Sequence, residues 1–538
     1  MKGGADLPGR PSALQPKGPS AAERLLPLCS NPSAMREPAP QGDGARQRGL
    51  PSFGRGPMLL KQDYYANEVW PGWLNDIRNS PHRAIFLHGV TGSELYDRQR
   101  RDTLWLDTGI WHEVDNLAFL DVTPQGGVDG PGQFIYARST VNLPVFGDFY
   151  ADCLSGIGWG RFNFDWRDGI GIEAQRLALF LRSLRTDGQP LRFVTHSMGG
   201  CVLLRMLAST REFDDAIERI VFCAPPFWGA LKPLRVIEDG TGTPADWLIG
   251  NATLRQSAAS MPGLFNLLVA PREYWPTRVP GLDATLKYPV RTGQDLYSAG
   301  SWTNPYRLDL RDPLLRFSYS GYQFTRVQAQ DVAQRFASRT VVIVGLNGKT
   351  EYAALMGPGG WTLHSEPPPA QGMLSNGDGT VLFQSSLLPG LPTTCYHAYV
   401  PPVREDSHSN LVNLPEVINA TLTALAGDSL ASSGLVPYAD FVHAIDWSHE
   451  AEQSPEPGPT EHLGYLERAR LRARLPLAQW GPSLDPGGND DRLFHATRQS
   501  AFKVLQGADL RTEAGRLGVS YRFLADHIRD LLLPVLSG

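Results

Sequence analysis

A serine set between small residues constrains this chain of 538 residues more than any other stretch. Ser197 follows a short apolar run at residues 191–194 and precedes an apolar run with helical spacing at residues 201–208. A serine at a tight turn from a strand into a helix is typical of a nucleophile elbow, which lifts the hydroxyl out of the sheet. The crowded backbone of such a turn requires small residues two positions before and after the serine. Gly199 fits, and Thr195 stands where glycine is usual.

Other short apolar runs predict the remaining strands of a sheet. They lie at residues 84–87, 220–223, 340–345 and 395–400, and residues 173–184 have the spacing of an amphipathic helix. Strands that alternate with helices predict an α/β fold, a mostly parallel sheet flanked by helices on both faces. The alternation stops over about residues 230–338, where Gly, Pro and aromatic residues mix. An insertion of this length between strands predicts a cap over the active site.

Two backbone amides are candidates for an oxyanion hole. The first belongs to Met198, because the residue after the nucleophile opens a helix whose N–H groups face the reaction centre. The second belongs to Val90, in the glycine-rich loop that follows the strand predicted at residues 84–87. A nucleophile-elbow fold places its other donor in such a loop. An ordinary turn between a strand and a helix is the alternative for this loop.

A nucleophilic serine needs a base, and the base needs a carboxylate to orient it. The order serine, acid, histidine along the chain is satisfied by Asp378 and His408, each on a loop after an apolar strand. Asp378 lies between two glycines, which let its loop turn sharply. His397, inside the last predicted strand, is the alternative base. Asp406, almost adjacent to the histidine, is the alternative acid.

The two ends of the chain differ in composition from the part between them. Residues 1–58 are rich in Gly, Pro, Ala, Ser and Arg, with Phe53 as the only aromatic residue, and predict a disordered tail. The expected catalytic domain covers residues 59–426, followed by a Pro- and Glu-rich linker at 427–462 and a small helical region at 463–538. Residues 512–520 have the glycine spacing of a helix-turn-helix. No basic stripe accompanies it and the net charge is −5, so no nucleic-acid partner is expected.

Cysteine usage and the lack of long apolar runs indicate in which cellular compartment the protein is expected. The five cysteines are scattered, and Cys201 and Cys223 lie in apolar patterns, so we expect buried free thiols and a reducing compartment. No apolar run reaches the roughly 18 residues of a membrane span, and no signal peptide is recognisable. We therefore expect a cytoplasmic protein, or one exported without a signal peptide. No Cys/His cluster has zinc spacing, and we expect neither metal nor cofactor.

Several stretches between about residues 80 and 425 carry a resemblance to a known family. They are residues 87–95, 104–107, 164–167, 196–200, 224–229 and 377–381, together with His408; the Asp-Trp-Arg and Gly-Asp-Gly-Thr-Val runs are the most specific. In these stretches the chain resembles the lecithin:cholesterol acyltransferase family of α/β hydrolases, which includes lysosomal phospholipase A2-type enzymes. The resemblance implies Ser197, Asp378 and His408 as a catalytic triad, Val90 and Met198 as oxyanion donors, and a structural role for the Asp-Trp-Arg run.

The expected activity is that of a serine-dependent acyl hydrolase or O-acyltransferase, which acts on phospholipid-type esters through an acyl-enzyme on Ser197. One alternative is a soluble carboxylesterase for small esters, and another is a catalytically dead scaffold that binds a partner through its cap. The apolar stretch at residues 261–268 predicts an acyl channel, or else the cap's own core. The expected partners are a lipid or ester substrate and, transiently, a membrane surface.

Overall fold

The computed structural model describes residues 57–99, 101–105, 135–143, 147–148, 150–185, 188–241, 251–282, 286–291, 295–357 and 360–447. The expected disordered tail up to residue 56 and the expected helical region at 463–538, with its helix-turn-helix pattern, lie outside the described residues. Within the described part, none of the helices has the length and apolar character that a membrane span requires.

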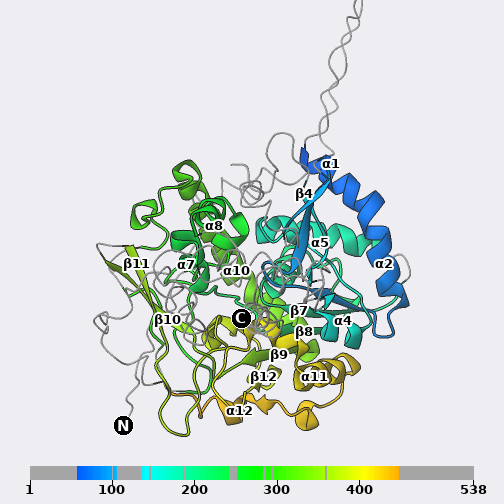
Figure 1. Ribbon diagram of the computed structural model, residues 1–538. Helices are drawn as coiled ribbons and strands as arrows, with labels where there is room; N and C mark the ends of the chain where they lie inside the picture. Colours follow the sequence, from blue (N-terminus) through cyan, green and yellow to red (C-terminus); the bar gives the residue numbers. More distant parts are fainter. Residues whose placement is uncertain are drawn as a thin grey trace, which may run out of the picture. The chain divides into compact units, whose positions relative to one another are not determined.

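A six-stranded sheet forms the centre of the fold (Figure 1). Its order is β1 (Ala84–Leu87), β7 (Leu191–His196), β8 (Ile217–Cys223), β9 (Thr340–Gly345), β12 (Tyr396–Tyr399) and β13 (Val436–Pro437). The strands from β1 to β12 run parallel, and β13 pairs with β12 in the antiparallel sense. The prediction of a mostly parallel sheet flanked by helices is confirmed, and so is the α/β-hydrolase class.

Alternate side chains along the strands enter two separate apolar cores, as expected when both faces of a sheet are covered. Ile85 and Phe193 belong to the core that includes side chains of α5 (Ile170–Leu184), α6 (Met198–Ser209) and α10 (Leu308–Phe336). Phe86 and Val194 belong to the core formed with α4 (Ala151–Ile157) and α11 (Pro415–Ala426). The helices therefore cover both faces and fix the carboxyl ends of the strands, where the site lies.

The outer edges of this sheet are both occupied. Beside β1, the Phe86 N–H donates to the carbonyl of Gly160 at 3.0 Å, and the Phe162 N–H donates to the carbonyl of Phe86 at 2.9 Å. At the other edge, the two-residue strand β13 places Pro437 opposite His397.

The domain extends beyond both predicted boundaries. Residues 427–447, predicted as linker, carry β13 and buried apolar side chains such as Phe441 and Ile445, so packing continues past residue 426. At the other end, α1 (Pro57–Tyr64) begins inside the segment predicted as tail. At the C-terminal boundary apolar side chains reach the core, which composition alone does not reveal.

The segment from β8 to β9 is helical, as an inserted cap would be. It carries α7 (Lys232–Asp239), α8 (Asn251–Ala258), α9 (Pro262–Phe265) and the 3₁₀ turn Ala299–Ser301 before α10. Val332 and Phe336 of α10 are buried in the apolar core that also contains side chains of the main sheet. The end of the predicted insertion therefore packs on the sheet and is not part of a separate cap.

Three antiparallel sheets were not predicted, and the shortest pairs β5 (Asn142–Leu143) with β6 (Gly147–Asp148). The hairpin of β10 (Glu351–Gly357) and β11 (Gly360–Ser365) follows β9, and its Ala354 pairs with Val290 of the cap. A three-stranded sheet of β3 (Asp102–Trp105), β2 (Ser93–Asp97) and β4 (Ile135–Thr140) follows β1.

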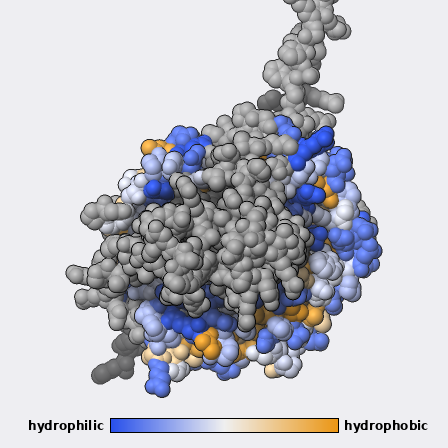
Figure 2. Space-filling model, in the orientation of Figure 1, coloured by the Kyte–Doolittle hydropathy of each residue, from blue (hydrophilic) through white to orange (hydrophobic). Residues whose placement is uncertain are grey.

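The remaining elements are short. They are the π-helix Tyr65–Val69, α2 (Trp70–Asn79), β5 (Asn142–Leu143), β6 (Gly147–Asp148), the 3₁₀ turns Ala337–Arg339, Phe383–Ser386, Thr393–Cys395, His408–Asn413 and Leu430–Ser432, and α12 (Tyr438–Phe441). On the described surface that faces the viewer in Figure 2, hydrophobic residues occur in small groups among hydrophilic ones.

Candidate active site

Ser197 lies at the turn between β7 and α6 in a backbone conformation that is strained for any residue but glycine. Its φ of 51° and ψ of −121° lie outside the regions that side chains with a Cβ atom prefer. A Cβ on Gly199 would lie 2.3 Å from the carbonyl oxygen of Leu87, so only glycine lets α6 start this close to the end of β1. The small residue expected after the serine thus has a steric cause.

His408 lies between Ser197 and Asp378. Its Nε2 is 3.1 Å from Ser197 Oγ, and its Nδ1 is 2.7 Å from Asp378 Oδ2. The other carboxylate oxygen, Oδ1, accepts the backbone N–H groups of Thr380 at 2.9 Å and Val381 at 2.7 Å. The His408 N–H donates to the Asp378 carbonyl at 3.0 Å, so backbone and side chain both tie the two residues together. All three side chains are buried.

Asp406 and His397, the alternative acid and base, make contacts different from those of Asp378 and His408. Asp406 Oδ1 accepts the Lys349 N–H at 2.7 Å, and burial raises the pKa of this carboxyl group. His397 stays within β12, in register with Ile343 and Pro437. Within the described residues, no group of three or more His, Cys, Asp or Glu side chains could hold a metal ion.

The segments of the two predicted oxyanion donors meet at the serine. Met198 is the first residue of α6, a position whose N–H has no acceptor within the helix. A Cβ on Gly89 would lie 3.1 Å from Ser197 Cβ, so the loop that carries Val90 touches the elbow. The two segments that carry the predicted donors therefore lie next to the serine, although they come from different parts of the chain.

His88, which sequence reasoning did not single out, orients the loop that carries Val90. Its Nε2 accepts the Phe164 N–H at 3.1 Å, so Nδ1 carries the proton and donates to the Gly89 carbonyl at 2.7 Å. Burial lowers the pKa of His88 to about 4, and the ring stacks on Phe164 at 4.1 Å. Carbonyl and N–H of a trans peptide point in opposite directions, so this bond turns the Val90 N–H away from His88.

The Asp-Trp-Arg run lies in a buried cluster of charges. Asp165 accepts Arg167 Nε at 2.9 Å, Arg167 Nη2 at 2.7 Å and Lys61 Nζ at 3.2 Å. Burial raises the pKa of Asp165, but the charges of Arg167 and Lys61 outweigh that effect and hold it well below its usual range. Arg176 pairs with Glu173 and lies 3.6 Å from Asp168. The cluster therefore places Lys61, Arg167 and Arg176 beside Asp165, Asp168 and Glu173. Burial raises the pKa of Asp168 and raises that of Glu173 to about 8.

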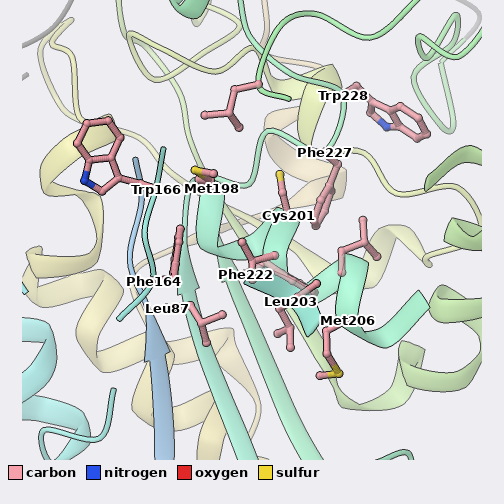
Figure 3. Close-up of a cluster of buried hydrophobic side chains, with 14 of the residues drawn as sticks. Leu87, Phe164, Trp166, Met198, Cys201, Leu203, Met206, Phe222, Phe227 and Trp228 are labelled. Atoms are coloured by element: carbon pink, nitrogen blue, oxygen red, sulfur yellow. The ribbon is translucent and has the colours of Figure 1, made fainter. Parts of the chain in front are cut away.

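The cap meets this cluster and the elbow at α9. The Gly263 N–H donates to the carbonyl of Arg167 at 2.8 Å. A Cβ at Gly263 would lie 2.1 Å from the Trp166 carbonyl oxygen and 3.1 Å from Met198 Cε. Figure 3 shows the apolar side chains around the first turn of α6, with Trp166 on one side of Met198 and Phe227 on the other. The cap thus packs directly against the residue that follows Ser197.

Part of the chain matches a known protein family. Residues 156–335 match the family described as LCAT: Lecithin:cholesterol acyltransferase. Over this segment the chain is similar to the lecithin:cholesterol acyltransferase family. The segment includes Ser197 and the Asp-Trp-Arg run, and ends before Asp378 and His408. This match supports an acyltransferase- or lipase-type activity on a lipid substrate.

Comparison with solved structures gives distant matches. A chain in "The crystal structure of Tle4-Tli4 complex" is 12% identical, with 64% of this chain and 97% of that chain covered and a TM-score of 0.42. The peroxisomal alpha-beta-hydrolase Lpx1 from Saccharomyces cerevisiae is 16% identical, with 75% of this chain and 86% of that chain covered and a TM-score of 0.23. Curated proteins give no match. The strand order and the elbow described above carry the fold assignment.

Proposed function

We propose that this protein is a serine-dependent lipid acyl hydrolase or O-acyltransferase, with Ser197 as nucleophile, His408 as base and Asp378 as the orienting acid. The observation that carries the proposal is the pair of hydrogen bonds at His408, 3.1 Å to Ser197 and 2.7 Å to Asp378. A carboxylate acceptor at Nδ1 keeps the proton on that nitrogen and leaves Nε2 free to accept the serine proton.

The reaction proceeds in two halves. Ser197 Oγ attacks the ester carbonyl carbon while its proton passes to His408 Nε2, and the amides of Val90 and Met198 donate to the developing oxyanion. Collapse of this intermediate expels the alcohol, which takes the proton from His408 and leaves an acyl-enzyme. Water or a second alcohol then attacks with His408 again as base, and the product is a fatty acid or a new ester.

The proposed substrate is a phospholipid-type ester, presented by a membrane surface that the protein contacts transiently. The family match over residues 156–335 supports a lipid, and the cap that packs on Met198 supports a site closed by apolar elements. One observation favours the small-ester alternative. Met261, Leu264 and Phe265 of the stretch predicted to line an acyl channel are buried, as they would be in the cap's own core. Dependence on acyl-chain length therefore decides between the two substrates.

The first experiment tests the nucleophile and the base. A fluorophosphonate should label the wild-type protein and fail to label Ser197→Ala, and kcat for a p-nitrophenyl ester should fall by about 10⁴–10⁶. His408→Ala should be nearly as damaging, whereas His397→Ala serves as the matched histidine control and should remain active. Full activity in Ser197→Ala, or loss in His397→Ala alone, would overturn these assignments.

The second experiment tests the substrate class. A channel gains roughly 0.8 kcal/mol per buried CH₂, so kcat/KM should rise several-fold with each methylene in a series of p-nitrophenyl esters from acetate to palmitate. Phospholipid vesicles should release fatty acid in parallel. A maximum at acetate or butyrate, with no release from vesicles, would discard the lipid substrate and leave a small-ester carboxylesterase.

A further inference from the structure

We propose that Tyr150 and His196 are positioning residues that hold the oxyanion loop and the catalytic base in register. The inference rests on the proposed function of Ser197 and His408. Three hydrogen bonds carry it, and they join segments far apart in the chain. The Gly89 N–H donates to Tyr150 Oη at 3.2 Å, Tyr150 Oη lies 3.1 Å from His196 Nδ1, and His196 Nε2 lies 2.8 Å from the carbonyl oxygen of His408.

We call this chain of three hydrogen bonds the relay. The groups at its two ends determine which atoms carry the protons. A carbonyl oxygen only accepts, so His196 Nε2 must carry a proton and donate it to the His408 carbonyl. Burial, reinforced by the neighbouring His408, lowers the pKa of His196 to about 3, so the ring is neutral near pH 7. A neutral ring protonated on Nε2 leaves Nδ1 as an acceptor, and the Tyr150 hydroxyl donates to it. Each hydrogen bond of the relay therefore has one defined donor and one defined acceptor.

The ends of the relay are the groups whose relative position catalysis requires. One end is the amide of Gly89, one residue before the proposed donor Val90, and the other is the backbone of His408. The His408 N–H is already bound to the Asp378 carbonyl, so the relay fixes the second backbone group of the base. The neutral His196 ring, 5.1 Å from that of His408, also does not compete for the serine proton at neutral pH.

The members of the relay have little freedom to move. Tyr150 is 1% exposed, and its ring centroid lies 4.8 Å from that of Phe86 on β1. His196 ends β7 and is also buried. Removing the Tyr150 hydroxyl leaves the ring packing intact but releases Gly89 and leaves His196 Nδ1 without that donor. The loop and the base then shift relative to each other.

The first test compares Tyr150→Phe with Tyr396→Phe. Tyr396 is a matched control on β12, because its buried hydroxyl also accepts a backbone N–H, that of Leu388 at 2.8 Å. With p-nitrophenyl butyrate, Tyr150→Phe should lower kcat by about 10- to 100-fold, the range typical of small misplacements, with KM nearly unchanged. Tyr396→Phe should lose similar thermal stability and keep its kcat. Equal kcat in Tyr150→Phe and wild type would overturn the proposal.

The second test determines the protonation of the His196 ring and does not depend on catalytic turnover. Nitrogen-15 NMR of histidine-labelled wild-type protein at pH 7 should show His196 neutral and protonated on Nε2. A ring protonated on Nδ1, or on both nitrogens, would overturn the proposal even if Tyr150→Phe failed to fold. His196→Gln keeps an N–H donor near Nε2, so it should retain at least tenfold more activity than His196→Leu, given that small misplacements cost about 100-fold. Equal activity of these two variants would count against the relay.

The two levels of inference can fail separately. If the wild-type protein does not react with a fluorophosphonate, the proposed function fails. If the wild type reacts and Tyr150→Phe reacts at the same rate per folded molecule, the serine chemistry stands and only the positioning role is wrong.

Discussion

Two buried histidines near the serine are held as opposite tautomers. His88 carries its proton on Nδ1 and His196 on Nε2, in each case because a backbone carbonyl accepts from that nitrogen. The second nitrogen of each ring is an acceptor, for the Phe164 N–H in one and the Tyr150 hydroxyl in the other. Protonation of either ring removes an acceptor that the surrounding structure uses, so both positions make the fold sensitive to acid.

The effect of His88 on acid stability can be measured by difference. The unfolded chain takes up this proton near the ordinary pKa of 6.5, and the folded chain only near pH 4. Between these values the unfolded state binds more protons, so acidification favours unfolding. The unfolding free energy of the wild type minus that of His88→Gln should therefore fall from pH 6.5 to pH 4, as measured by urea titration at each pH. A constant difference would mean that His88 titrates normally in the fold.

At the scale of single elements, the contact of α9 with the Asp-Trp-Arg run depends on Gly263. A Cβ there would lie 2.1 Å from the Trp166 carbonyl oxygen, a backbone atom between Asp165 and Arg167 of the charge cluster. Gly263→Ala should therefore destabilise the protein by about 1–3 kcal/mol, as overpacking does. Gly72→Ala, within α2 and with no atom within 4 Å of its Cβ, is the matched control and should be neutral or stabilising. Thermal unfolding of both variants measures the difference, and equal melting temperatures would show that α9 is free to shift.

The elements that the sequence predicts well are those with strong local signals. The strands at 84–87, 220–223 and 340–345 contain continuous apolar runs, the last over residues 341–344, because helices cover both faces of these strands. The hairpin at 351–365 has an apolar run only in its first strand, and part of each strand is half-buried. Its Ala354 also pairs with Val290, a contact between distant parts of the chain that local sequence does not reveal.

The same distinction applies to the site. Ser197, Asp378 and His408 were predicted from turn chemistry and chain order, and the structure brings them within hydrogen-bond distance. Their catalytic roles stay a prediction. Tyr150 could not be predicted, because it lies 46 positions from His196 and has no motif around it. A hydrogen-bond relay that crosses elements leaves no spacing signal in the sequence.

At the scale of the whole molecule, the charge cluster joins α1 to the α5 region across 104 positions of the chain. Lys61→Met leaves the buried Asp165 and Asp168 with one cation fewer, and breaking a buried ion pair costs about 3–5 kcal/mol. We expect a loss of this size in urea unfolding. The exposed pair of Arg182 and Glu212 supplies the control, because Arg182→Met should change stability by no more than about 1 kcal/mol. Equal effects of the two variants would show that Lys61 does not support the cluster.

Truncation tests the boundary at the start of α1. Deletion of residues 1–56 should leave the melting temperature and the hydrolysis of a small ester unchanged, because this segment has the composition of a chain without a core. Deletion through residue 64 also removes Lys61 and should lower stability at least as much as Lys61→Met. A fall in melting temperature on the shorter deletion would show that these residues pack on the domain.

The occupied edges of the main sheet govern how copies of this protein meet. An open edge strand presents unpaired N–H and C=O groups onto which a second chain can add its own strand, a common start of aggregation. Here the segment at residues 160–162 binds the backbone of β1, and at the far edge Pro437 has no N–H to offer. Strand addition by a second molecule is therefore disfavoured at these two strands.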